Sequence, residues 1–166
     1  PPDKPLLLVL ESQNDMPAVL RALNNVGLDN VAGYLEGGMG AYAASGLETA
    51  RLESISVFEA RERFEKGEIY LVDTRLKSEW DSGHIKCTVH IPAPDVRKQY
   101  QNLIGNKPVA FICNSGNRSL LASSLMLNLS GAKNVINVIG GTTAWINLGY
   151  QTVKEGEYEY CALPLR

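Results

Sequence analysis

Two segments of this chain, Gly27 to Thr49 and Gly131 to Val153, repeat one another. The matching positions are Gly27 with Gly131, Asn30-Val31 with Asn134-Val135, Gly37-Gly38 with Gly140-Gly141 after one extra residue in the first copy, Ala41-Tyr42 with Ala144-Trp145, and Gly46 with Gly149. A strand-like apolar run and a helix-like segment precede each copy: LLLVL and MPAVLRALNNV before the first, VAFIC and SLLASSLMLNL before the second. The chain therefore contains one strand–helix–strand–helix unit twice.

Only the second copy has further structure upstream, between residues 55 and 108. This stretch predicts a helix that starts at Ile55-Ser56 and is capped by Gly67, a buried strand IYLVDT, a polar turn SEWDSG, a short strand TVHIP and a helix PDVRKQYQNLI. Alternating strands and helices indicate a parallel sheet covered by helices on both faces. We therefore predict an α/β fold with a complete domain over residues 51–155. A partial unit over residues 1–50, equivalent to the second half of such a domain, precedes it, and a tail over residues 156–166 follows.

Composition excludes several classes of function. The chain is 45% hydrophobic and 20% charged, as globular proteins usually are, and its formal net charge is −2. This charge argues against a protein that binds nucleic acid or membrane surfaces in general. No apolar run is long enough to span a bilayer, and the start, PPDKP, has no signal-peptide pattern. Because it lacks an initiator Met, we expect the chain to be part of a longer polypeptide.

Cysteine and histidine are scarce. Cys87, Cys113 and Cys161 form no CxxC pair, and His84 and His90 are the only histidines. We therefore expect no disulfide framework, no metal, no cofactor and a reducing, cytoplasmic location. Cys87 and Cys161 are expected to be packed core residues, because neither lies in a cationic loop at the start of a helix.

Cys113 has a different setting, at the end of the predicted buried strand VAFIC and directly before a helix. Ligands bind at the carboxyl ends of strands in parallel α/β sheets. The loop that follows Cys113 consists of Asn114, Ser115, Gly116, Asn117, Arg118 and Ser119. Gly116 permits an unusual backbone angle and Ser119 is the expected N-cap of the helix, so the loop predicts a ring of N–H groups around the sulfur. Such a ring lowers the pKa of the thiol, and Arg118 would attract an oxyanion such as thiosulfate.

Other polar residues near the predicted strand ends are interpreted as structural. Asp73 and Arg75 lie at the end of the strand IYLVDT and are expected to brace the loop through hydrogen bonds and ion pairs, with Glu79 as a candidate partner. His84 is expected to be structural, because a thiolate held by N–H groups needs no base. Gly140-Gly141 predicts a tight turn, because the GxGxxG spacing of a phosphate loop is absent.

Two separated motifs resemble the rhodanese-like sulfurtransferase family. CNSGNRS, together with GGTTAWINLGY, resembles the family's active-site loop and C-terminal signature, and LVDTRLKSEWDSGHIKCTVHIP is similar to its upstream signature. The resemblance covers residues 55–153. It implies that Cys113 attacks a sulfane-sulfur donor, carries the sulfur as a persulfide and passes it to a thiol acceptor, with residues 114–119 binding the substrate. Residues Lys86, Cys87 and Thr88 depart from the Pro-Gly-Ala that is usual in the family.

The first copy lacks these chemical groups. Counted back from Gly27 without a gap, Val9 takes the place of Cys113 and Asn14 that of Arg118, so the first copy is interpreted as inactive. A degenerate unit before an active one also resembles the C-terminal part of fusion proteins that carry an N-terminal metallo-β-lactamase-fold domain. Half a domain would expose apolar surface and a strand edge, which predicts association, including a homodimer.

Three classes of function remain open. The leading interpretation is an enzyme that uses thiosulfate or a persulfide. The second is a non-catalytic or persulfide-presenting module that serves an attached metallo-β-lactamase-fold hydrolase or persulfide dioxygenase. The third is a phosphatase or arsenate reductase on the same fold. It is disfavoured because only four residues separate Cys113 from Arg118 and because Ile112, not a histidine, precedes the cysteine.

Overall fold

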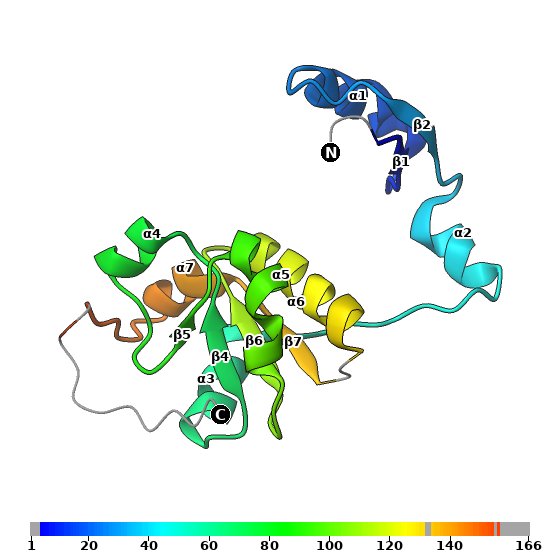
Figure 1. Cartoon of the computed structure of the whole chain (residues 1–166). Helices are drawn as coiled ribbons and strands as arrows, with labels where there is room; N and C mark the ends of the chain where they lie inside the picture. The colour runs from blue at the N-terminus through cyan, green and yellow to red at the C-terminus, as the bar shows by residue number, and fades with distance from the viewer. Residues whose placement is uncertain (1–3, 132–133, 155, 157–166) are drawn as a thin grey trace. The chain divides into compact units, whose positions relative to one another are not determined.

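The computed structural model describes residues 4–131, 134–154 and 156. It divides the chain into two compact units, Pro1–Arg51 and Leu52–Arg166 (Figure 1). The predicted tail, residues 156–166, lies outside the described residues except for Gly156. Among the described helices, none combines the length and the apolar character that crossing a bilayer requires.

The second unit is built on a five-stranded sheet. Its elements are β3 (Glu53–Ser56), α3 (Val57–Glu65), β4 (Tyr70–Asp73), α4 (Lys77–Ser82), β5 (Val89–His90), η2 (Ala93–Asp95), α5 (Val96–Gln99), η3 (Tyr100–Leu103), β6 (Val109–Ile112), α6 (Asn117–Ser130), β7 (Val135–Ile139) and α7 (Gly141–Asn147). The strands pair in parallel in the order β3-β7-β6-β4-β5. The predicted α/β class with a parallel sheet is confirmed.

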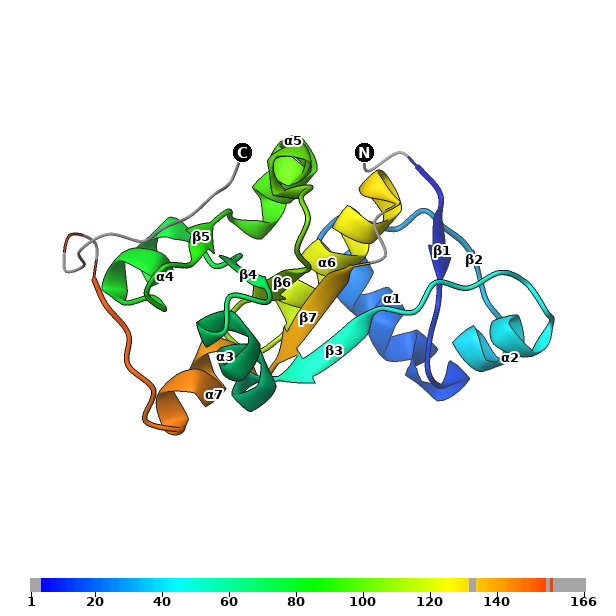
Figure 2. The same cartoon turned by 90° about the horizontal axis from the view of Figure 1, so that it is seen from below.

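Helices cover both faces of the sheet (Figure 2), and alternate side chains of each central strand enter two separate cores beneath them. Leu71 of β4 and Ile112 of β6 pack with α3 and α7 on one face, whereas Val72 of β4 and Phe111 of β6 pack with α5 and α6 on the other. A strand that is covered on both faces must be apolar at every position, which explains the unbroken runs in the sequence. Full burial of a side chain such as Phe111 contributes about 1.5–3 kcal/mol.

Three local predictions need correction. Ile55 belongs to strand β3 and pairs with Val138, so the helix starts only after Ser56, whose hydroxyl caps the N–H of Glu59 at 3.2 Å. The expected polar turn SEWDSG is helix α4, because Trp80 buries its ring on the inner side. The expected helix PDVRKQYQNLI is divided into η2, α5 and η3. Tertiary contacts override weak local signals in the first two cases.

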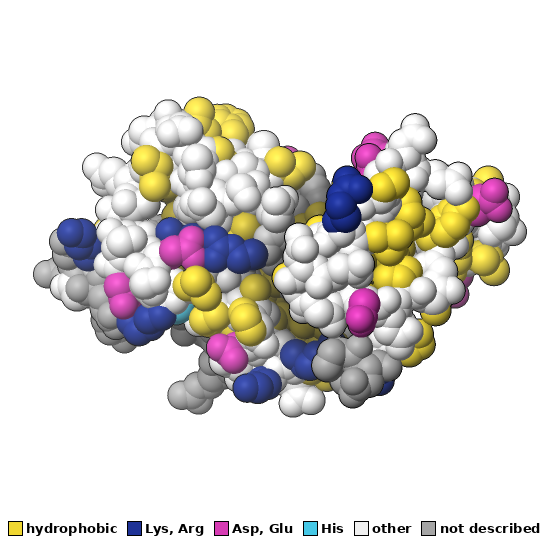
Figure 3. All heavy atoms as spheres, turned by 90° about the horizontal axis from the view of Figure 1, so that it is seen from above, with side chains coloured by type: hydrophobic (Ala, Val, Ile, Leu, Met, Phe, Trp, Pro, Cys, Tyr) yellow, Lys and Arg dark blue, Asp and Glu magenta, His cyan; other side chains and the backbone are white. Residues whose placement is uncertain are grey.

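The first unit contains β1 (Leu6–Leu8), η1 (Gln13–Asp15), α1 (Met16–Asn24), β2 (Val31–Tyr34) and α2 (Gly38–Ala44), with β1 and β2 parallel. This order is that of β6, α6, β7 and α7. Gly38 is the only buried residue among those described in this unit, and hydrophobic side chains gather on its surface (Figure 3). The large apolar side chains more than half exposed here are Leu7, Val9, Val26, Met39 and Leu47. A two-stranded sheet with so little buried apolar surface is not stable on its own.

Candidate active site at the carboxyl end of the sheet

Cys113 directly follows strand β6, and its thiol is free and buried. Gly116, three residues later, has a φ of 111° and is the N-cap of α6. This left-handed conformation favours glycine, and it turns the loop back over the sulfur. The N–H of Gly116 donates a hydrogen bond of 3.2 Å to Sγ of Cys113. The loop therefore aims the Gly116 N–H at the sulfur, as one donor of the predicted ring would be.

The start of α7 anchors the outer side of this loop. The N–H of Thr142 donates to the carbonyl oxygen of Cys113 at 2.7 Å, and that of Thr143 donates to the carbonyl oxygen of Asn114 at 3.0 Å. Gly141 approaches so closely that a Cβ there would lie 2.2 Å from the Cys113 carbonyl oxygen. The prediction of a tight turn and close packing at Gly140-Gly141 is therefore confirmed by the positive φ of both glycines.

The surroundings of Cys113 lower the pKa of its thiol below the ordinary value. Burial acts in the opposite direction and is the largest single influence. The Ser119 hydroxyl and the backbone N–H groups of Ser119, Gly116 and Ser115 together outweigh it, because each stabilises the negative sulfur. The arrangement favours a thiolate, the reactive form of cysteine.

Ser119 does not cap the helix, contrary to the prediction. The N-cap of helix α6 is Gly116, three residues earlier, and the helix begins at Asn117. Ser119 lies in the first turn and is completely buried. Its hydroxyl contacts the carbonyl oxygen of Gly116 at 3.0 Å and Oδ1 of Asn137 at 2.7 Å. It therefore points towards the interior of the site.

Arg118 forms an ion pair with a carboxylate, a contact that the sequence does not indicate. Its Nη1 and Nη2 donate to the two carboxylate oxygens of Glu79 at 2.6 and 2.7 Å. The Arg118 guanidinium lowers the pKa of Glu79 to about 2, assisted by the N–H of Leu76. The pKa of Arg118 is raised chiefly by Glu79, with smaller contributions from Cys113. The cation beside the sulfur is therefore largely neutralised.

Asp73 and Arg75 form their own buried pair and do not contact Glu79 as expected. The Arg75 Nε donates to both Asp73 oxygens at 3.0 and 2.9 Å, and Nη2 donates to Asp73 Oδ2 at 2.7 Å and to the Gly83 carbonyl at 2.9 Å. Asp73 is the register partner of Ile112, the residue before Cys113. The pair thus braces the strand end beside the loop, and the opposite charges of Asp73 and Arg75 compensate each other.

His84 and His90 contact Trp80 of α4. The rings of Trp80 and His84 stack at 3.6 Å, and those of Trp80 and His90 at 4.7 Å. Nδ1 of His84 lies 3.1 Å from the carbonyl oxygen of Trp80, and Nε2 of His90 lies 2.9 Å from that of Arg75. These contacts favour the structural role expected for His84.

The sequence profile of the Rhodanese-like domain family matches residues 56–148. The chain belongs to the rhodanese-like family. "Putative sulfurtransferase YtwF" of Bacillus subtilis (strain 168) is 37% identical over 95 residues, which are 57% of this chain and 90% of that protein. "Putative sulfur carrier protein YrkF" of the same organism is 39% identical over 75 residues, 45% of this chain; the match spans only 40% of that protein.

Solved structures agree with this assignment. A rhodanese-related protein of Thermoplasma volcanium has a TM-score of 0.56 and 31% identity, covering 62% of this chain and 99% of that one. The human single-domain sulfurtransferase TSTD1 has a TM-score of 0.51 and 25% identity, covering 58% and 97%. The parallel sheet and its flanking helices are therefore those of rhodanese-like structures.

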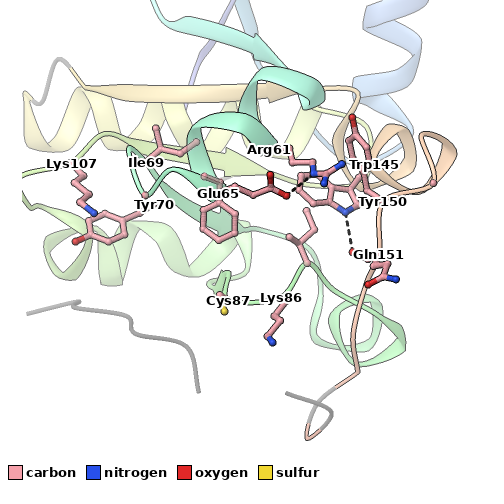
Figure 4. Close-up of a pocket in the computed structure, with 14 residues that line it drawn as sticks. Arg61, Glu65, Ile69, Tyr70, Lys86, Cys87, Lys107, Trp145, Tyr150 and Gln151 are labelled. Carbon is pink, nitrogen blue, oxygen red and sulfur yellow. Dashed lines mark hydrogen bonds and ion pairs between the residues drawn. The ribbon is translucent and has the colours of Figure 1, made fainter. Parts of the chain in front are cut away.

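A cavity of about 690 Å³ lies near the amino ends of strands β4 and β6, away from the end that carries Cys113 (Figure 4). Tyr70, at the start of β4, and Trp145 are among its lining residues, and Lys86 and Cys87 lie on its other side. Cys87 is disulfide-bonded and only partly buried at the cavity, so the expectation of a packed core residue outside any disulfide is wrong for it. Cys161 lies outside the described residues. The described part of the chain contains no cluster of metal-ligating side chains.

The structure places two residues, Glu79 and Asn137, at the site in roles that the sequence does not indicate. Glu79 was expected beside Asp73 and Arg75 but binds Arg118. Asn137 was not singled out at all, although a lone amide within the apolar run VINVI is a signal that a buried polar partner exists. Asn114, Ser115 and Asn117 are exposed at the outer rim of the loop, where a substrate can reach them.

Proposed function

We propose that the chain is a rhodanese-type sulfurtransferase in which Cys113 is the nucleophile. The Cys113 thiolate attacks the outer sulfur of thiosulfate or of a persulfide donor. The donor's S–S bond breaks, and sulfite or a thiolate leaves with the electron pair. A thiophilic acceptor then attacks the outer sulfur of the Cys113 persulfide, takes that sulfur and regenerates the thiolate. Residues 114–119 hold the transferred sulfur, and Asp73 and Arg75 support the loop from behind.

One observation carries this proposal: a free, buried thiol receives the Gly116 N–H at 3.2 Å within a ring of donors that lowers its pKa. A cysteine that merely fills a core has no need of such donors. Membership of the rhodanese-like family and the sulfurtransferase relatives point in the same direction.

Mass spectrometry of the Cys113 peptide tests the proposal directly. After incubation with thiosulfate or with a low-molecular-weight thiol persulfide, the peptide should gain the mass of one sulfur atom and lose it again on addition of cyanide. Cys113→Ser should abolish sulfur transfer and leave the fold intact, because the two side chains are nearly isosteric. Cys87→Ser, at the cavity away from Cys113, should change the rate little. A Cys113→Ser variant that keeps most of the activity would refute the assignment.

A second candidate is a persulfide-presenting module that serves an attached metallo-β-lactamase-fold hydrolase or persulfide dioxygenase domain. The exposed apolar surface of the first unit favours it, because such surface is normally covered by a partner. We propose that this unit is half of a degenerate rhodanese-like domain that pairs with further chain or with a second copy. A cytoplasmic location, small sulfur compounds as partners and the absence of a cofactor remain predictions.

The two candidates differ in turnover. An enzyme should transfer sulfur repeatedly from thiosulfate or a persulfide to cyanide when the chain is isolated. A presenting module should accept one sulfur at Cys113 and release it slowly unless its partner domain is supplied. A phosphatase or arsenate reductase should show neither behaviour.

A further inference from the structure

Asn137 is a buried amide in the middle of strand β7. Only 4% of its surface is exposed, and its neighbours Ile136 and Val138 are fully buried. Its Oδ1 accepts a hydrogen bond of 2.7 Å from the hydroxyl of Ser119. A polar group this deeply buried is costly unless it has a partner, so this contact holds the amide in the strand.

The Ser119 hydroxyl has one proton and more than one acceptor within reach. Asn137 Oδ1 lies at 2.7 Å and the Gly116 carbonyl oxygen at 3.0 Å, and the same hydroxyl is the strongest of the groups that lower the pKa of the Cys113 thiol. A hydroxyl donates only one proton at a time. When the Ser119 hydroxyl donates its proton to Asn137, it therefore cannot donate the same proton to the sulfur.

We propose that Asn137 is a positioning residue that directs the Ser119 proton, competing with the Cys113 sulfur for it. The empty thiolate carries its charge on Sγ and draws the proton towards itself. Once a persulfide forms, the charge moves to the outer sulfur, about 2.05 Å farther along the new S–S bond. The inner sulfur is then a weak acceptor, and Asn137 receives the proton, so that no buried hydroxyl loses its partner. This role rests on the proposed function, in which Cys113 carries the sulfur.

The first copy of the repeat offers an internal comparison. Counted back by the same gapless alignment, Val9 replaces Cys113, Asp15 replaces Ser119 and Gly33 replaces Asn137. Strand β2 therefore forms without an amide at this place. The strand itself does not require Asn137, whereas the copy that has the cysteine has both the hydroxyl and the amide.

The ionisable groups around Cys113 lie on other elements. Arg118 of α6 interacts with the sulfur and is neutralised by Glu79 of α4. Asp73, the last residue of β4, forms an ion pair with Arg75. The sequences of β7 and α7, VINVI and GTTAWIN, contain no ionisable side chain. Replacing Asn137 by a neutral residue therefore removes the hydrogen bond with Ser119 and leaves the charges around Cys113 unchanged.

The pH dependence of Cys113 alkylation by iodoacetamide, followed on the Cys113 peptide, tests the proposal. Asn137→Leu removes the competing acceptor, so the midpoint should move to lower pH, with roughly a twofold to tenfold faster reaction below the midpoint. Ser119→Ala should move the midpoint to higher pH. In the Ser119→Ala background, Asn137→Leu should leave the midpoint unchanged. Alkylation does not depend on sulfur transfer, so this role and the proposed function can fail separately.

Other outcomes would overturn the proposal. A looser loop would weaken all N–H donors and shift the Asn137→Leu midpoint upward, and a role independent of Ser119 would give equal shifts in both backgrounds. If Asn137→Leu fails to fold, the nearly isosteric Asn137→Asp, which as a carboxylate can only accept, replaces it. In Asn137→Asp, the alkylation midpoint should move to higher pH, and it should move farther with Ser119 present than in the Ser119→Ala background. An equal shift in both backgrounds would mean that the added charge alone causes it, which would refute the competition for the Ser119 proton.

Discussion

The guanidinium of Arg118 holds the carboxylate of Glu79 through two hydrogen bonds of 2.6 and 2.7 Å across 39 residues of sequence. The pair joins the active-site loop to helix α4, an element that the sequence did not predict. The side chains of Arg118 and Glu79 are 36% and 31% exposed, so solvent screens part of their attraction. The Arg118–Glu79 pair joins the loop to α4 and places a compensating negative charge next to the cation beside Cys113.

We expect the two residues to be coupled in stability. Arg118→Ala and Glu79→Gln should each lower the free energy of unfolding, and the double variant should lose less than the sum, with a coupling of about 1 kcal/mol. Chemical denaturation of the four proteins measures this coupling. Arg61 and Glu65, an exposed i,i+4 pair at 2.7 Å, provide a matched control with a smaller expected coupling. Additive effects at Arg118 and Glu79 would mean that the contact has no energetic weight.

Substitutions at Glu79 and at Arg118 should change the use of thiosulfate in opposite directions. Glu79→Gln leaves the Arg118 charge uncompensated, so the KM for thiosulfate, a dianion, should fall. Arg118→Ala should weaken the use of thiosulfate more than that of a neutral persulfide donor. Steady-state kinetics with both donors measures the contrast. Equal losses with both donors would instead assign Arg118 to holding the loop.

The thiol of Cys113 should react at lower pH than an ordinary cysteine. Its pKa in the folded protein is lowered, so the alkylation rate, which follows the thiolate fraction, should rise with a midpoint below the ordinary value of about 8.5. Denatured protein provides the reference, because unfolding removes the Gly116 and Ser119 donors. Coincident profiles for folded and denatured protein would show that the loop does not stabilise the thiolate.

Gly141→Ala should destabilise the fold far more than Gly149→Ala. Both glycines have a positive φ, 60° and 76°, so the backbone strain of an alanine is similar, about 1 kcal/mol. Only at Gly141 would the new Cβ meet backbone atoms, since nothing lies within 4 Å at Gly149. We expect an additional loss of about 1–3 kcal/mol and slower sulfur transfer. Thermal unfolding of both variants tests this, and equal melting temperatures would contradict it.

The first unit should cause association. Leu7 and Met39 are 78% and 54% exposed, and β1 and β2 form a sheet of only two strands. We expect static light scattering to report self-association of the isolated chain, and Leu7→Lys to reduce it by adding charge to the exposed strand. A strictly monomeric chain whose first unit can be removed by limited proteolysis without loss of solubility or activity would contradict the prediction.

The sequence by itself determined the features that depend on local pattern. Unbroken apolar runs predicted β4 and β6, the repeat predicted the order of elements in both copies, and Gly116 and Gly140-Gly141 predicted turns that need a positive φ. The position of Cys113 at a strand end followed from the same pattern. These signals are readable because neighbouring residues generate them.

Only the tertiary structure decided which distant side chains meet. Strand β3 exists because it pairs with β7, and Ser119 turns inward because Asn137, 18 residues later, offers it an acceptor. Arg118 binds Glu79 because folding brings α4 beside the loop. Such partners depend on how the elements pack, and many polar residues in the sequence are chemically able to fill each role.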